Sequence, residues 1–234
     1  MNYTRFVGIL SKNPMKKITI VDYGIGNIKS ISNMLDFLGI DVVVTSNPKK
    51  IINASSLILP GVGSFDYAMM SLNKKHLIDP LNEAVMSKQI PILGICLGMQ
   101  IMSSRSEEGR LEGLSWIPSS VIRINSEARK DDLPSKSIIT KPQSLIVPHI
   151  GWSKVKIKRN NLLFNNMRLF EDPRYYFVHS YYVKCKFTKH VIATIDYGNE
   201  MCCAFNSDNI FGVQFHPEKS HKYGMNLLRQ FYNA

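Results

Sequence analysis

Neither long hydrophobic runs nor regularly spaced cysteines occur in this chain of 234 residues. The first sixteen residues hold one short apolar stretch, residues 6–10, which is too short for a signal peptide or a membrane span. This absence predicts a soluble protein that stays in the cytoplasm and has no membrane partner. The four cysteines lack the spacing of a disulfide framework or a zinc site, so we expect reduced thiols and neither a metal nor another cofactor.

Signs of a domain boundary or of a nucleic-acid partner are also missing. No Pro/Gly/Ser-rich linker, low-complexity tract or internal repeat divides the chain, and 44% hydrophobic residues suffice for one large core. We therefore expect an N-terminal extension over residues 1–15 and a single domain over residues 16–234. The net charge of +11 comes from scattered lysines and arginines without a basic helical stripe, which argues against nucleic-acid binding.

The first half of the chain alternates between strand-like and helix-like patterns. Apolar runs typical of buried strands occur at residues 17–21, 41–45, 56–59 and 91–95. Helical spacing occurs at residues 27–38, at 67–88 with a break near Asp79-Pro80, and from Leu97 onward, whereas Asn47-Pro48 predicts a turn. This alternation predicts an α/β fold with a central, mostly parallel sheet that helices flank on both faces.

Short strand-like runs dominate after about residue 115. They occur at residues 120–124, 144–147, 175–178, 191–195, 201–205 and 209–213, and a helix is expected at 221–232. Because no linker precedes them, these runs predict an additional antiparallel β layer on the same sheet and not a second domain.

Cys96 directly follows one of the expected parallel strands, between Gly94 and Gly98. Glycine on both sides lets the chain turn sharply from strand to helix, so we expect an exposed thiol above the carboxyl end of the sheet. Ligands of such sheets bind at this end. The position therefore predicts a nucleophile.

His216 and Glu218 follow another apolar strand, residues 211–215. Residues two apart on an extended chain point the same way, so both side chains can act on one side of the sheet. An imidazole beside a thiol would stabilise the thiolate and return a proton to the leaving group, and a carboxylate would fix the imidazole tautomer. His-Pro-Glu alone is a weak signal, since a single histidine is more often structural, but its combination with Cys96 favours catalysis.

A third segment, Pro60-Gly61-Val62-Gly63, continues an apolar strand into a glycine turn. Attack on a carboxamide creates an oxyanion, which exposed backbone amides can stabilise; the candidates are the amides of Gly61 or Val62 and of Leu97. An ordinary turn is the alternative interpretation. A phosphate-binding loop is disfavoured, because the Lys-Ser/Thr ending of a P-loop is missing.

These three segments resemble the motifs of the class I (triad) glutamine amidotransferases, which have a flavodoxin-like fold. The motifs are Pro60-Gly61-Val62-Gly63, Gly94-Ile95-Cys96-Leu97-Gly98-Met99-Gln100 and His216-Pro217-Glu218. Three more motifs resemble the glutaminase subunits of imidazole glycerol phosphate synthase, an enzyme of histidine biosynthesis. They are Asp22-Tyr23-Gly24-Ile25-Gly26-Asn27, Pro148-His149-Ile150-Gly151-Trp152 and His216-Pro217-Glu218-Lys219-Ser220. The resemblance covers about residues 17–232.

The resemblance implies glutamine as the substrate and a role for each matching residue. Cys96 would attack the side-chain amide of glutamine, His216 would act as base and acid, and Glu218 would orient it. The oxyanion hole would comprise Gly61, Val62 and Leu97, with the amide of Val62 turning into place once the partner is loaded. Glutamine would be held by Gly63, Gln100, Glu108, His179, Ser180 and Tyr181.

The resemblance also implies a heterodimer with a cyclase subunit of (β/α)₈ fold, which receives the ammonia and forms imidazole glycerol phosphate and AICAR. Trp152 and Lys219 would lie at that interface, although a Trp packed over the sheet is an equally simple interpretation. The family usually has Asn where this chain has Ser153. This departure concerns the partner contacts and not the glutaminase chemistry.

Three other functions compete with this interpretation. The same glutaminase could supply ammonia to a sugar amidotransferase of surface-polysaccharide biosynthesis, which the variant interface leaves open. A non-catalytic binding subunit is disfavoured because Cys96, His216 and Glu218 are all present. A stand-alone cysteine peptidase would leave Gln100, Glu108 and the His-Pro-Glu-Lys-Ser motif unexplained.

Overall fold

The computed structural model describes residues 16–125, 145–167, 170 and 172–234. The expected N-terminal extension over residues 1–15 lies outside the described residues. Within them, no helix is long and apolar enough to cross a membrane.

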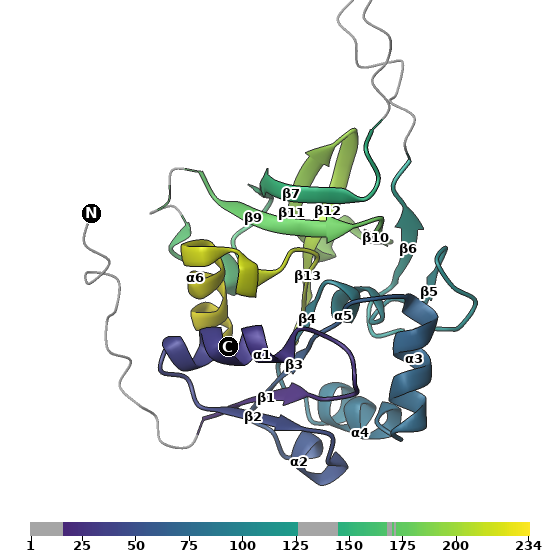
Figure 1. Ribbon diagram of the computed structural model, residues 1–234, viewed down its shortest axis with the longest axis vertical. Coiled ribbons are helices and arrows are strands. Elements are labelled where there is room, and N and C mark those ends of the chain that lie inside the picture. Colours follow the sequence, from purple (N-terminus) through teal and green to yellow (C-terminus); the bar gives the residue numbers. More distant parts are fainter. Residues whose placement is uncertain (1–15, 126–144, 168–169, 171) are drawn as a thin grey trace, which may run out of the picture.

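An eight-stranded sheet lies at the centre of the protein, with the strand order β2-β1-β3-β4-β13-β12-β11-β8 (Figure 1). The first five strands are parallel: β2 (Val42–Thr45), β1 (Ile18–Val21), β3 (Ser56–Leu59), β4 (Ile92–Ile95) and β13 (Ile210–Val213). Three antiparallel strands extend the sheet: β12 (Asn199–Ser207), β11 (Val191–Tyr197) and β8 (Lys156–Ile157). The predicted fold class, a mostly parallel sheet with an antiparallel extension, is confirmed.

Helices cover both faces of this sheet, because successive side chains of each buried strand point to opposite faces. Ile18 and Ile20 pack into one core with α1 (Ile28–Phe37) and α6 (His221–Tyr232). Val21, Leu57 and Leu59 pack into a second core with α3 (Phe65–Lys74) and α4 (Ile78–Asn82), on the other face (Figure 1).

Two smaller sheets pack against the antiparallel half of the central one. One has the order β10 (Tyr181–Cys185), β6 (Ser119–Arg123), β5 (Arg105–Ser106), and the other pairs β7 (His149–Lys154) with β9 (Arg174–His179). The strand expected at 144–147 is wrong, since the described residues 145–147 form none and β7 begins only after Pro148. Proline has no N–H to donate to a β ladder, so the ladder starts at the next residue.

Two local predictions in the helical layer are also wrong. Asn47 does not form a simple turn with Pro48 but caps a helix, α2 (Pro48–Ile52), by accepting hydrogen bonds from the N–H groups of Lys49 and Lys50. The break in the long helical stretch falls after Lys74, with His76 in a left-handed conformation, and not at Pro80. Pro80 lies in the first turn of α4, where its missing N–H disrupts no helical hydrogen bond.

The remaining helical segments are short. They are α5 (Leu97–Gln100), a π-helical turn (Glu83–Ser87) and 3₁₀ turns at Leu162–Phe164, Thr188–His190 and Pro217–Lys219.

Candidate active site

Cys96 occupies the sharp turn between β4 and α5, with φ +54° and ψ −111°. Glycines make this turn possible, because a Cβ on Gly98 would lie 1.8 Å from the carbonyl oxygen of Leu59, and one on Gly94 would lie 2.7 Å from that of Gly98. A left-handed conformation at a residue with a side chain is strained and marks many functional sites. The structure thus places the thiol on a constrained turn at the carboxyl end of the sheet.

The thiol is less exposed than the sequence predicts. Cys96 is 7% exposed because Gln214 and His216 lie against its side chain. β4 and β13 are parallel neighbours with Ile95 opposite Val213, so the residues that follow the two strands meet. The Cys96 N–H donates to the carbonyl oxygen of Val213 at 2.8 Å, which ties the two strand ends together.

His216 and Glu218 form a buried pair beside this thiol. Nδ1 of His216 is 2.8 Å from Oε1 of Glu218, and the two side chains are 2% and 1% exposed. Because a carboxylate only accepts, Nδ1 is the donor, and Nε2 is left for the thiol. Nε2 has no hydrogen-bond partner in the described part of the chain, although the Cys96 thiol lies close enough to influence the pKa of the ring. Burial by itself lowers the pKa of His216, but interactions with Cys96 and Glu218 outweigh it and raise that pKa to about 10.

The main chain around His216 is held from both sides. Its N–H donates to the carbonyl oxygen of Tyr176 at 2.9 Å, and the Ser220 hydroxyl donates to its carbonyl at 2.6 Å. The same hydroxyl oxygen accepts the N–H of Tyr176 at 3.0 Å. Ser220 therefore links the turn that contains His216 and Glu218 to β9.

The glycine turn after β3 packs directly on the start of α5. A Cβ on Gly61 would lie 2.5 Å from the backbone nitrogen of Gly98, so the turn touches the helix that begins at Leu97. Tyr23, which belongs to a motif of the resemblance but had no role expected for its side chain, donates its hydroxyl to the carbonyl oxygen of Pro60 at 2.5 Å. Burial raises the pKa of Tyr23 far above its ordinary value, which keeps it a donor. Val62 is 44% exposed, and Gly63 has a positive φ of +102° with open space around it.

The residues expected to hold glutamine fall into two groups. Nε2 of Gln100 and Nδ1 of His179 both lie 2.9 Å from the carbonyl oxygen of Tyr181, next to Ser180 in the turn between β9 and β10. Glu108 is placed elsewhere, where its Oε2 accepts the N–H of Phe65 at 2.8 Å at the start of α3. A carboxylate is favourable at a helix N-terminus, which gives Glu108 a structural role as well.

Trp152 and Lys219 lie on one surface, next to the His216–Glu218 pair. Trp152 is 44% exposed and stacks on His221 with ring centroids 5.4 Å apart and parallel planes. Nζ of Lys219 lies 5.5 Å from the centre of the Tyr176 ring, whose edge also contacts Trp152. The half-exposed Trp152 ring makes this aromatic surface accessible to a partner.

The sequence matches the model of the family "Glutamine amidotransferase class-I" over residues 19–234. The chain belongs to this family. Among curated relatives, it is 47% identical to "Imidazole glycerol phosphate synthase subunit HisH 2" of Methanococcus maripaludis and 45% identical to the HisH subunit of Leptospira interrogans. Both alignments span 214 residues, 92% of this chain and 98% of the relative. The amidotransferase is thus also a member of the HisH group.

Solved structures of other class members show the same fold. A putative GMP synthase component from Thermoplasma acidophilum has a TM-score of 0.66 at 20% identity, covering 94% of this chain and 93% of that one. PurLQS from Thermotoga maritima has a TM-score of 0.64 at 19% identity, with 93% and 98% coverage. The amidotransferase fold therefore confirms the flavodoxin-like prediction.

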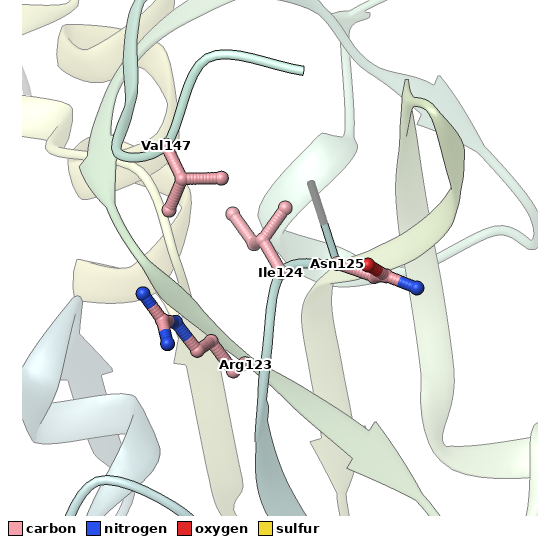
Figure 2. A pocket seen from close by; sticks show the side chains of 4 residues that line it. All are labelled: Arg123, Ile124, Asn125 and Val147. Carbon is pink, nitrogen blue, oxygen red and sulfur yellow. The ribbon is translucent and has the colours of Figure 1, made fainter. Parts of the chain in front are cut away.

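The amidotransferase has a cavity of about 310 Å³ (Figure 2). Arg123, Ile124, Asn125 and Val147 line it. It adjoins the expected glutamine-binding segment, because the N–H of Ile124 donates to the carbonyl oxygen of Ser180 at 2.9 Å. None of the lining residues belongs to the Cys96–His216–Glu218 group. Nowhere in the described chain do three or more His, Cys, Asp or Glu side chains form a possible metal site.

Proposed function

We propose that this chain is the glutaminase subunit of an imidazole glycerol phosphate synthase, which hydrolyses glutamine to glutamate and ammonia. The observation that carries the proposal is the convergence of Cys96 and the His216–Glu218 pair at the paired ends of β4 and β13. The assignment to histidine biosynthesis is supported by 47% identity to a HisH subunit, in an alignment that covers 98% of that relative.

In the first step, the Cys96 thiolate attacks the side-chain carbonyl carbon of glutamine. The negative charge that develops on the carbonyl oxygen is stabilised by the backbone amides of Leu97 and of Gly61 or Val62. Protonated His216 then gives its Nε2 proton to the nitrogen, so that ammonia leaves and a γ-glutamyl thioester remains. His216 is suited to this acid role because its raised pKa of about 10 keeps it protonated at neutral pH.

In the second step, water hydrolyses the thioester. Neutral His216 takes a proton from the attacking water, glutamate leaves, and the thiolate is restored beside an imidazolium. Glu218 holds Nδ1 throughout, which keeps Nε2 directed at the reacting atoms. Glutamine itself is held by Gly63, Gln100, Glu108, His179, Ser180 and Tyr181.

The ammonia passes to a cyclase partner of (β/α)₈ fold, which docks on the surface of Trp152, Tyr176, Lys219 and His221. This surface lies next to Glu218, so ammonia released at Cys96 enters the interface and not bulk solvent. Large aromatic side chains that are half exposed are typical anchors of protein interfaces. The heterodimer is therefore the functional unit.

The test measures glutamate release from glutamine by the purified chain, alone and with the cyclase. We expect slow release by the free chain and strong activation by the cyclase, with the activity lost in Cys96→Ala and retained in Cys185→Ala, the matched control. Equal rates for wild type and Cys96→Ala would refute the assigned nucleophile. Activation by a sugar amidotransferase and none by the cyclase would refute the histidine-pathway assignment.

A further inference from the structure

Gln214 is a buried side chain that touches the nucleophile and has no role in the mechanism above. It is fully buried at the end of β13, and its Nε2 lies 3.6 Å from Sγ of Cys96. Its main-chain N–H donates to the carbonyl oxygen of Cys203 at 2.9 Å, which anchors it to β12. A hydrogen bond to sulfur needs the nitrogen end of the amide to face the thiol, and the surrounding contacts decide whether it does.

The orientation of this amide follows from a backbone carbonyl that can only accept. The Tyr181 carbonyl oxygen is 2.9 Å from one end of the Gln100 amide, so that end is the nitrogen. The same nitrogen is 3.0 Å from one end of the Gln214 amide, which must then be Oε1. The other end of Gln214, which faces Sγ, is the NH₂ group.

A second branch leads from the Tyr181 carbonyl to the surface and has a fixed direction as well. His179 donates its Nδ1–H to this carbonyl, so neutral His179 accepts at Nε2 from Nδ1–H of His149, 3.1 Å away. His149 in turn accepts at Nε2 from the Ser153 hydroxyl at 2.8 Å. Burial lowers the pKa of both His149 and His179 to about 4, so both rings are neutral near pH 7 and keep this direction.

We propose that Gln214 positions the nucleophile by donating a hydrogen bond to the Cys96 thiolate, in an orientation fixed by Gln100 and the Tyr181 carbonyl oxygen. A hydrogen bond to an ionised acceptor is about twice as strong as one between neutral groups, so the bond favours the thiolate over the thiol. It also directs the sulfur between Gln214 and His216. The role in turnover rests on the proposed glutaminase function, whereas the bond itself does not.

Alkylation of Cys96 by iodoacetamide tests the bond without any need for glutaminase activity. Gln214→Met removes the donor at similar length, and Gln214→Glu replaces it with an acceptor. We expect both variants to be alkylated at Cys96 at least about tenfold more slowly than wild type at pH 7. Gln230→Met, which replaces another buried glutamine on α6, is the matched control and should react like wild type. Wild-type alkylation rates in folded Gln214→Met would overturn the proposal.

Two further measurements separate positioning from a purely structural role. In the cyclase complex, Gln214→Met should lower kcat by about the same factor as it lowers the alkylation rate, and it should change KM for glutamine much less. A change confined to KM would overturn the proposal. The side-chain amide signals of Gln214 in a ¹⁵N NMR spectrum should shift in Cys96→Ala, and unchanged signals would also overturn it. The NMR measurement decides the question even where the Gln214 variants do not fold.

Discussion

Replacing Gly98 by alanine probes the contact that brings the glycine turn and the nucleophile together. A Cβ at this position would lie 1.8 Å from the carbonyl oxygen and 2.8 Å from the carbonyl carbon of Leu59. Both atoms belong to the backbone, so no side chain can rotate away. To reach an ordinary contact of about 3.4 Å, α5 and the end of β3 must separate by roughly 1.6 Å. Cys96 stands directly before α5, and Pro60 directly follows β3.

The expected effect on stability follows from the cost of overpacking. A forced backbone shift of this kind costs about 1–3 kcal/mol, and in a domain of this size each kcal/mol lowers Tm by about 2–4 °C. We therefore expect Tm to fall by roughly 2–12 °C in thermal unfolding. Since a 1 Å misplacement of reacting groups can cost about 100-fold in rate, kcat for glutamate release in the cyclase complex should fall by about that factor.

Gly39→Ala is the control for this prediction. Gly39 carries a positive φ of +73°, which Gly98 does not. No atom lies within 4 Å of the Cβ added to Gly39, and this residue follows the end of α1, away from Cys96. Its alanine variant should lose some stability through backbone strain and keep its kcat. If Gly98→Ala kept both its Tm and its kcat, the argument that close backbone packing positions the nucleophile would be refuted.

Three further predictions concern the same site. Glu218→Gln removes a carboxylate that raises the pKa of His216, so kcat should drop at least about 100-fold. As pH is raised, the remaining activity should be lost at a lower pH than in wild type, because the imidazolium loses its proton earlier. A pH–rate profile that does not move would contradict this. Tyr23→Phe removes the hydrogen bond to Pro60 and should lower Tm and kcat but not the affinity for the cyclase, as calorimetry can check. Trp152→Ala should weaken cyclase binding at least about tenfold and leave Tm nearly unchanged, whereas unchanged affinity would remove Trp152 from the interface.

Periodicity and glycine spacing are sufficient to predict most elements of the fold. The buried strands β1 and β3 and the helices α1 and α6 lie within a residue or two of their expected positions, since a fully apolar run or an amphipathic spacing has one favourable packing. The errors arise where local signals compete. Proline indicates a turn at Pro48 and a break at Pro80, although it is well tolerated in the first turn of a helix.

Sequence alone determined which side chains have the required chemistry and at which strand ends they stand, because covalent spacing sets the turn at Cys96 and the pairing of His216 with Glu218. Only the tertiary structure decided how these groups are held. Burial of Cys96, the donation from Tyr23 to Pro60 and the orientation of Gln214 toward the thiol depend on contacts between distant parts of the chain. Gln100 and Gln214 are 114 residues apart, and no local pattern specifies the direction of a hydrogen bond over such a separation.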